Sequence, residues 1–149
     1  MRIWVAAAAA AAISTSVWAG VIAPKDVAFQ DGTIPQSLTG VAGDPVKGKD
    51  WFVGRKLGNC LACHVNSDAT EESFHGEVGP PLDGVADRWT EAELRGILVN
   101  SKVVFEGTIM PAFYKDSGYN RNNKKFEGKT ILEAQQVEDV IAYLMTLKE

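Results

Sequence analysis

The chain has 149 residues, a length that suits one domain with a sizeable core, and 46% of its residues are hydrophobic. Nineteen acidic against fifteen basic residues give a formal net charge of −4. No basic tract of the kind that binds nucleic acid is present, and the nearest one, residues 121–125, is interpreted as a solvated loop. We therefore expect no nucleic acid partner.

Residues 1–19 have the pattern of a secretory signal peptide. Arg2 supplies a positive charge, an alanine-rich apolar run follows at 3–13, and Val17-Trp18-Ala19 is a small-residue cleavage site before Gly20. A membrane anchor is the alternative, but the run is shorter than the ~20 apolar residues that span a bilayer. We expect cleavage, a mature chain in a bacterial periplasm and no membrane association afterwards.

The first helix signal of the mature chain lies at Asp44. This residue precedes Pro45, and together they form an N-cap with proline at the first helical position. A helix is predicted from there to about Lys56, with Gly58 as its stop.

Cys60-Leu61-Ala62-Cys63-His64 is the most informative stretch, because Cys-x-x-Cys-His is the attachment signature of a c-type haem. Each thiol can add to one haem vinyl group, and the histidine can then bind the iron from the proximal side. The stretch predicts one covalently attached haem c, held by Cys60 and Cys63, with His64 as a metal ligand.

Three other sites could use the same residues. A short disulfide leaves His64 without a role, and a thioredoxin-type redox pair normally lies in a βαβ setting that the sequence lacks. Zinc would need His64 and His75 with both cysteines, yet His64 directly follows Cys63 and can hardly share a tetrahedral site with it. Haem explains more of the stretch than any of these.

Two further helix starts lie downstream. Thr90 with Glu93 has the capping-box pattern, and the helix that it opens is apolar on one face. Thr130 with Glu133 repeats the pattern before an apolar stripe that runs to the C-terminus. The apolar residues are Leu94, Ile97 and Leu98 in the first helix, and Val137, Val140, Ile141, Leu144 and Met145 in the second.

These signals predict an all-α domain at 43–149, with three main helices and long loops packed around one haem, after an N-terminal extension at 20–42. No strand pattern is convincing, and segments 20–42, 65–79 and 111–129 are too polar or glycine-rich to be assigned an element. Loops this long seldom persist in a compact domain. The flat apolar face of a haem would give them a surface on which to pack.

The iron needs a sixth ligand or an open site. Met110 lies in a loop beyond the second predicted helix, where its thioether can approach the face opposite His64, so we predict Met110 as the second metal ligand. His75 is the alternative, since imidazole is the stronger ligand. Met145 belongs to the apolar stripe of the last helix and is assigned to packing.

A set of residues spread over the C-terminal hundred or so positions forms a known pattern. It comprises Gly48, Phe52, the motif at 60–64, Gly79-Pro80-Pro81-Leu82, Gly84, Arg88, Met110-Pro111 and Tyr143. This set resembles a class I cytochrome c. Four longer stretches, 59–64, 76–86, 108–114 and 136–144, are similar to the SoxX family, the small cytochrome subunits of SoxAX complexes in thiosulfate oxidation.

The resemblance implies roles for further haem-binding residues. The Pro80 carbonyl would accept the Nδ1 proton of His64, which fixes the ring and strengthens the ligand. Leu82 follows in the same haem-binding segment. Arg88 would pair with a haem propionate, the alternative being an ordinary surface arginine.

The resemblance also implies a close helix crossing. Gly48 would let the first and last helices approach, with Phe52 and Tyr143 filling the crossing. The stretch from Phe52 to Cys60 is longer than in the small mitochondrial-type cytochromes, which leaves the helix pairing open.

The function implied by the resemblance is that of the electron-accepting haem subunit in a heterodimeric L-cysteine S-thiosulfotransferase. SoxA would be the partner, and the SoxYZ carrier and a downstream electron acceptor would bind transiently. The isolated chain would hold no catalytic residue. A freestanding soluble cytochrome c for another dehydrogenase or oxidase is the alternative, and a haem-based ligand sensor would require an open or displaceable sixth position.

Overall fold

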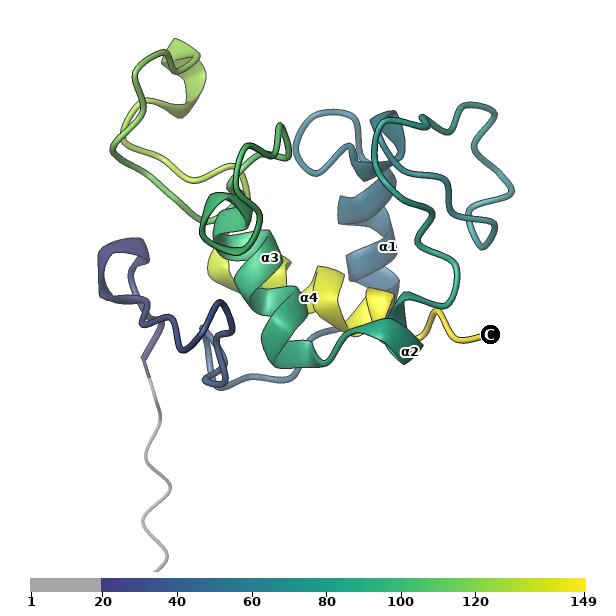
Figure 1. Ribbon diagram of the computed structural model, residues 1–149, viewed down its shortest axis with the longest axis horizontal. Coiled ribbons are helices and arrows are strands. Elements are labelled where there is room, and N and C mark those ends of the chain that lie inside the picture. Colours follow the sequence, from purple (N-terminus) through teal and green to yellow (C-terminus); the bar gives the residue numbers. More distant parts are fainter. Residues whose placement is uncertain (1–19) are drawn as a thin grey trace, which may run out of the picture.

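The computed structural model describes residues 20–149, so the predicted signal peptide at 1–19 lies outside the described residues. The described part contains no strand, only an isolated bridge between Gln30 and Thr33. Its α-helices are α1 (Pro45–Val53), α2 (Val85–Arg88), α3 (Glu91–Val104) and α4 (Ala134–Leu144), and 3₁₀ turns lie at Pro24–Asp26, Cys60–Ala62 and Lys124–Phe126 (Figure 1). The predicted all-α class is confirmed. No helix within 20–149 has the length and apolar character needed to cross a bilayer.

Helix α1 begins as predicted and ends early. The Asp44 side chain accepts hydrogen bonds from the backbone N–H groups of Val46 and Lys47, which leaves those first-turn donors satisfied. The predicted end at Lys56 is wrong, because the helix stops at Val53. Gly54 takes an extended ψ of 111°, and its carbonyl oxygen accepts from the Asn59 N–H at 3.0 Å. This bond turns the chain toward Cys60.

The starts of α3 and α4 differ in how well the sequence predicted them. Thr90 and Glu93 form the predicted capping box before α3. The predicted start of α4 at Thr130 is wrong, since Glu133 is the N-cap and forms its capping box with Gln136. The two residues before Glu133 both donate backbone N–H groups to the Phe113 carbonyl oxygen, at 3.0 and 2.9 Å, so they are held by another loop rather than by a helix.

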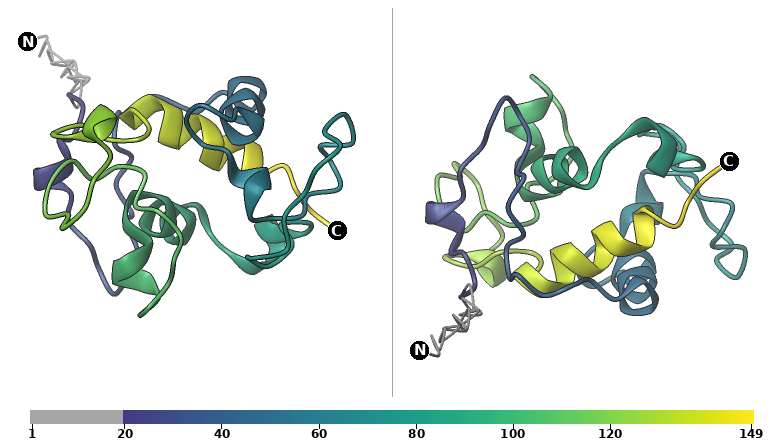
Figure 2. Two further views of the ribbon diagram at one scale, coloured as in Figure 1. Left: turned by 90° about the horizontal axis from the view of Figure 1, so that it is seen from above. Right: turned by 90° about the horizontal axis from the view of Figure 1, so that it is seen from below.

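Helices α1 and α4 cross closely, as the resemblance implied (Figures 1 and 2). A Cβ atom at Gly48 would collide with the carbonyl oxygen of Asp139 in α4, so only glycine allows this approach. The Phe52 and Tyr143 rings meet edge to face beside it, with centroids 5.3 Å apart. The longer stretch after Phe52 therefore leaves the helix pairing intact.

Segment 20–42 packs into the core although it forms little regular structure. Ile34 and Leu38 are almost completely buried, at 1% and 0% exposure. A buried ion pair holds them: Arg95 of α3 bonds Glu138 of α4 at 2.8 Å, Arg95 donates to the Ile34 carbonyl oxygen, and Glu138 accepts from the Leu38 N–H. Each charge therefore has both a partner and a backbone contact, which burial of charge requires.

Candidate haem site

The haem motif forms a tight turn at the end of the loop after α1. Asn59 takes a left-handed conformation (φ 50°) and leads into the 3₁₀ turn at Cys60–Ala62. The N–H groups of Cys63 and His64 both donate to the Cys60 carbonyl oxygen, at 3.1 and 3.0 Å. Both cysteines are half-buried free thiols, so the turn fixes them and the histidine in one short unit.

Segment 76–82 folds back over this unit. Its backbone N–H groups donate to carbonyl oxygens of the motif and the residue after it: Gly76 to Leu61 at 2.7 Å, Gly79 to Cys63 at 2.7 Å, and Leu82 to Val65 at 2.9 Å. A Cβ atom at Gly79 would collide with the imidazole ring of His64. The segment can lie against the ring only because this residue is glycine.

The hydrogen bond of His64 fixes the role of each ring nitrogen. Its Nδ1 lies 2.7 Å from the Pro80 carbonyl oxygen, the contact that the family resemblance implied. A carbonyl oxygen only accepts, so Nδ1 carries the proton and donates it. In the neutral ring, this tautomer leaves the lone pair on Nε2, the nitrogen that can bind a metal.

The thiol chemistry does not suit a thioredoxin-type pair. Burial, with a smaller contribution from the Cys63 sulfur, raises the pKa of the Cys60 thiol to about 12. A redox-active pair works through a thiol whose pKa is lowered. As for zinc, residues 20–149 bring no three His, Cys, Asp or Glu side chains together at one site.

The candidates for the sixth ligand lie in different surroundings. Met110 is half-buried and packs against the hydrophobic core. His75 uses both ring nitrogens inside its own loop: Nδ1 accepts from the Asn66 N–H at 3.3 Å, and Nε2 lies 3.2 Å from the Ala69 carbonyl oxygen. The hydrogen bonds of His75 would have to break before its ring could reach a metal. Within residues 20–149, the Met110 sulfur makes no such hydrogen bond. Met145 lies at the C-cap of α4.

Comparison with known proteins identifies the family. Residues 46–148 match the cytochrome c family. The chain belongs to that family. A chain of the crystal structure of SoxXA from P. pantotrophus has 50% sequence identity, aligns with 85% of this chain and 98% of its own length, and gives a TM-score of 0.80. The predicted resemblance is thereby confirmed. No curated protein matched the chain.

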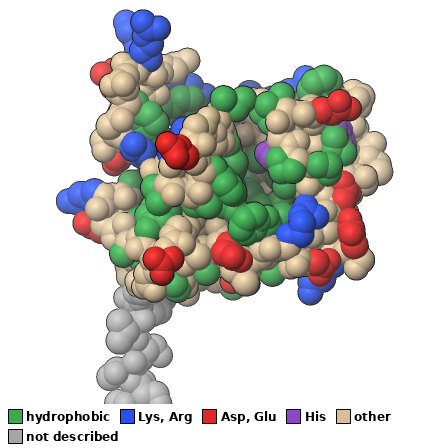
Figure 3. Space-filling model, viewed as in Figure 1, with side chains coloured by type: hydrophobic (Ala, Val, Ile, Leu, Met, Phe, Trp, Pro, Cys, Tyr) green, Lys and Arg blue, Asp and Glu red, His purple; other side chains and the backbone are tan. Residues whose placement is uncertain are grey.

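Cytochrome c family membership implies haem c, and the described residues fit it. The motif supplies two thiols and one free imidazole nitrogen, the donor set that this group requires. Figure 3 shows a hollow with mostly hydrophobic walls on one face of the molecule. Among residues 20–149, Trp51 Nε1 is the buried side-chain polar atom that lacks a hydrogen-bond partner. It lies in α1 before the motif, and an acceptor on a bound group would satisfy it.

Two further predicted haem-binding residues of this cytochrome lie in segment 81–88. Leu82 is half-buried and packs against the core. Arg88 is exposed and donates to the carbonyl oxygens of Asp83 and Pro81, at 2.6 and 2.8 Å, so its guanidinium closes the turn before α2. The predicted propionate pair of Arg88 stays a prediction.

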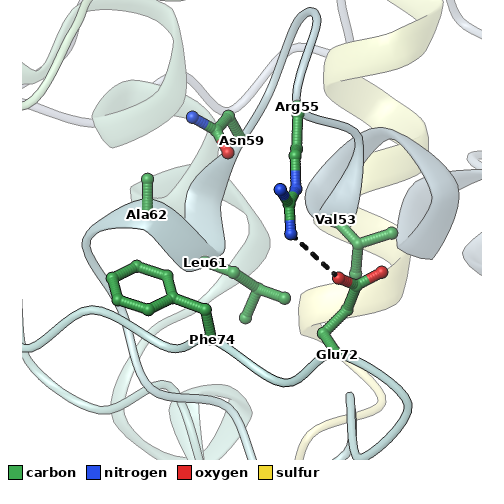
Figure 4. Close-up of a pocket in the computed structure, with 7 residues that line it drawn as sticks. All are labelled: Val53, Arg55, Asn59, Leu61, Ala62, Glu72 and Phe74. Atoms are coloured by element: carbon green, nitrogen blue, oxygen red, sulfur yellow. Dashed lines mark ion pairs between the residues drawn. The ribbon is translucent and has the colours of Figure 1, made fainter.

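A cavity of about 260 Å³ lies against the haem motif (Figure 4). Its walls include Leu61, Ala62 and Phe74, with Arg55 and Glu72 3.9 Å apart at their closest nitrogen and oxygen. Leu61 and Ala62 belong to the motif, but none of the predicted haem attachment residues or iron ligands lines the cavity.

Two residues that hold the Met110 loop were not predicted from the sequence. The carbonyl oxygen of Met110 accepts hydrogen bonds from the Ser101 hydroxyl, at 2.7 Å, and from the Lys102 ammonium group. Neither residue stands in a recognisable motif, because both lie in what reads as the end of an ordinary helix. No sequence signal pointed to them.

Proposed function

We propose that the chain carries one haem c, attached through Cys60 and Cys63 and bound by His64 and Met110. The observation that carries this proposal is the His64 Nδ1 bond to the Pro80 carbonyl oxygen, which makes Nε2 the metal-binding nitrogen in the residue that directly follows Cys63. The bound iron would accept and release one electron at a time. His64 would bind through a fixed ring, and the soft thioether of Met110 would favour the reduced iron.

We infer that this electron carrier works in sulfur oxidation, with SoxA as its partner in a bacterial periplasm. The support is 50% identity over most of the chain to a chain of SoxXA. In such a complex, thiosulfate would join a cysteine thiol of the SoxYZ carrier. An S–S bond forms, the S–H bond breaks, and one proton and two electrons leave. This chain would pass those electrons, one after the other, to a downstream acceptor.

The cysteine count indicates which subunit would carry out sulfur transfer. Cys60 and Cys63 are the only cysteines in the sequence, and thioether attachment would use both thiols. No thiol nucleophile would remain for sulfur transfer. The isolated chain would then be redox-active without being catalytic, and the sulfur-handling group of the L-cysteine S-thiosulfotransferase would belong to SoxA.

The test is to purify the native holoprotein from the periplasm and assay it with and without SoxA. We expect a second haem-bearing chain in the same peak, and no sulfur transfer by this subunit until SoxA is added. Stoichiometric thiosulfate labelling of the subunit alone, seen as a covalent mass increase, would contradict the division of labour. A subunit that elutes alone and gains no activity with SoxA would instead indicate a freestanding electron carrier.

A further inference from the structure

Helix α3 contains a kink that no sequence signal predicts. Asn100 has non-helical backbone angles (φ −153°, ψ 87°), so the residues after it form a separate last turn. In a straight helix, the carbonyl oxygens of Leu98 and Val99 would accept from N–H groups four residues later. Here they accept from Phe113 and Tyr114, at 3.0 and 3.3 Å. The kink therefore opens the helix end to the chain that follows Met110.

The last turn of α3, after the kink, is hydrogen-bonded to the backbone around Met110. The Ser101 side chain, in a residue with 0% exposure, donates to the carbonyl oxygens of Met110 at 2.7 Å and Pro111 at 3.3 Å. The Lys102 ammonium group donates to the Thr108 carbonyl oxygen at 2.7 Å and to that of Met110. The Met110 N–H is also engaged, since it donates to the Thr108 hydroxyl at 3.2 Å. Both polar backbone groups of Met110 are thus fixed.

We propose that this last turn of α3 is a clamp that presents Met110 to the iron, with Ser101 and Lys102 as positioning residues. The inference rests on the proposed function, because it takes Met110 as the axial ligand. Neither residue would touch the haem. They would act by holding the carbonyl oxygen from which the Met110 side chain extends.

The clamp would set the fraction of molecules in which the Met110 thioether is bound to the iron. A methionine side chain has three rotatable bonds, so its backbone anchor carries much of its order. One hydrogen bond contributes about 0.5–1.5 kcal/mol, which corresponds to a change of about two- to tenfold in an equilibrium. Loss of one clamp residue should shift the methionine-bound fraction by that factor.

The experiment titrates ferric holoprotein with imidazole, which competes with Met110 for iron, and records the weak long-wavelength methionine–iron band. Ser101→Ala should raise the imidazole affinity by about two- to tenfold. Because Ser101 is buried, this variant could fail to assemble. In that case Lys102→Met tests the clamp, because Lys102 is exposed and the variant should assemble. Loss of Lys102 should raise the imidazole affinity by a similar factor. Lys102→Arg keeps the charge and donors and should restore most of the lost affinity of Met110.

Lys115→Met is the matched control, because it removes one lysine from the chain beyond Pro111 and leaves the clamp intact; its imidazole affinity should be that of the parent. Unchanged imidazole affinity and band in Ser101→Ala and Lys102→Met, with loss of the band in Met110→Ala, would overturn the clamp alone. An unchanged band in Met110→Ala would overturn the ligand assignment of the proposed function and the clamp with it. An equal rise in Lys115→Met would trace the effect to charge.

Discussion

The two proposed axial ligands are held at different points of their side chains. His64 is fixed at the ring itself, by the Pro80 carbonyl oxygen and by contact with Gly79. Met110 is fixed at its backbone, by Ser101 and Lys102, while its thioether is held by no hydrogen bond. A ligand anchored at its ring can hardly leave without disrupting the motif, whereas one anchored at its backbone can swing away. If both residues bind the iron as proposed, His64 would be the permanently held ligand and Met110 the exchangeable one.

The largest effect is expected from removing the thiols that would hold the haem on the His64 side. Cys60→Ser with Cys63→Ser should abolish covalent attachment completely, because no other cysteine can form a thioether. The measurement is the mass of the denatured mature protein, together with acid-acetone extraction of the haem. Haem that still resists extraction from the double variant would contradict the assignment of the motif.

A second substitution disturbs the His64 ring without replacing any proposed ligand. Gly79→Ala places a methyl group against His64, and overpacking of this kind costs about 1–3 kcal/mol. We expect low holoprotein yield and an altered haem spectrum in what assembles. Gly128→Ala is the control: its φ of 65° also strains alanine, but open space surrounds it, so stability should fall while the spectrum stays unchanged. Equal spectra in both variants would refute the close-approach argument.

On the distal side, Met110→Ala should leave the haem attached and change only its sixth position. The methionine–iron band should vanish and the reduction potential should fall, because a thioether favours ferrous iron. His75→Ala and Met145→Ala should do neither. If the band instead disappears in one of those two and persists in Met110→Ala, the distal ligand has been misassigned.

The smallest effect concerns the loop after His64. Asp68 accepts hydrogen bonds from Lys49 and from the Tyr143 hydroxyl, which lower its pKa below the ordinary 3.8. The charged carboxyl therefore stabilises the fold above that pH, and this contribution is lost as the pH falls through the lowered pKa. Because Asp68 is half-exposed, we expect less than about 1 kcal/mol.

The measurement for this loop is the urea unfolding free energy of the parent and of Asp68→Asn as a function of pH. The two should differ at neutral pH and converge in acid. Glu106→Gln, an exposed carboxyl near the Met110 loop, is the control and should differ little from the parent at any pH. A constant difference between the parent and Asp68→Asn would show that the ionised carboxyl is not what holds the loop.

Local signals predicted what local contacts decide. The haem motif, the Asp44 cap and the Thr90 capping box each depend on residues within four positions, so their structure could be inferred from spacing alone. The all-α class followed from the same signals. The crossing at Gly48 came from the family resemblance, and the structure supplies its reason in the Asp139 carbonyl oxygen.

Tertiary contacts decided the rest. Helix α4 starts later than predicted because the two residues before Glu133 donate their N–H groups to the Phe113 carbonyl oxygen. At the Asn100 kink, the following loop supplies N–H groups to the carbonyl oxygens of Leu98 and Val99. Segment 20–42 carries no clear element in the sequence, because long-range contacts order it, among them those to the buried pair of Arg95 and Glu138, which are themselves 43 residues apart. The groups available to bind a haem and the starts of most helices can be inferred from local sequence patterns. How firmly each group is held depends on contacts between distant residues, because such hydrogen bonds leave no periodic trace in the sequence.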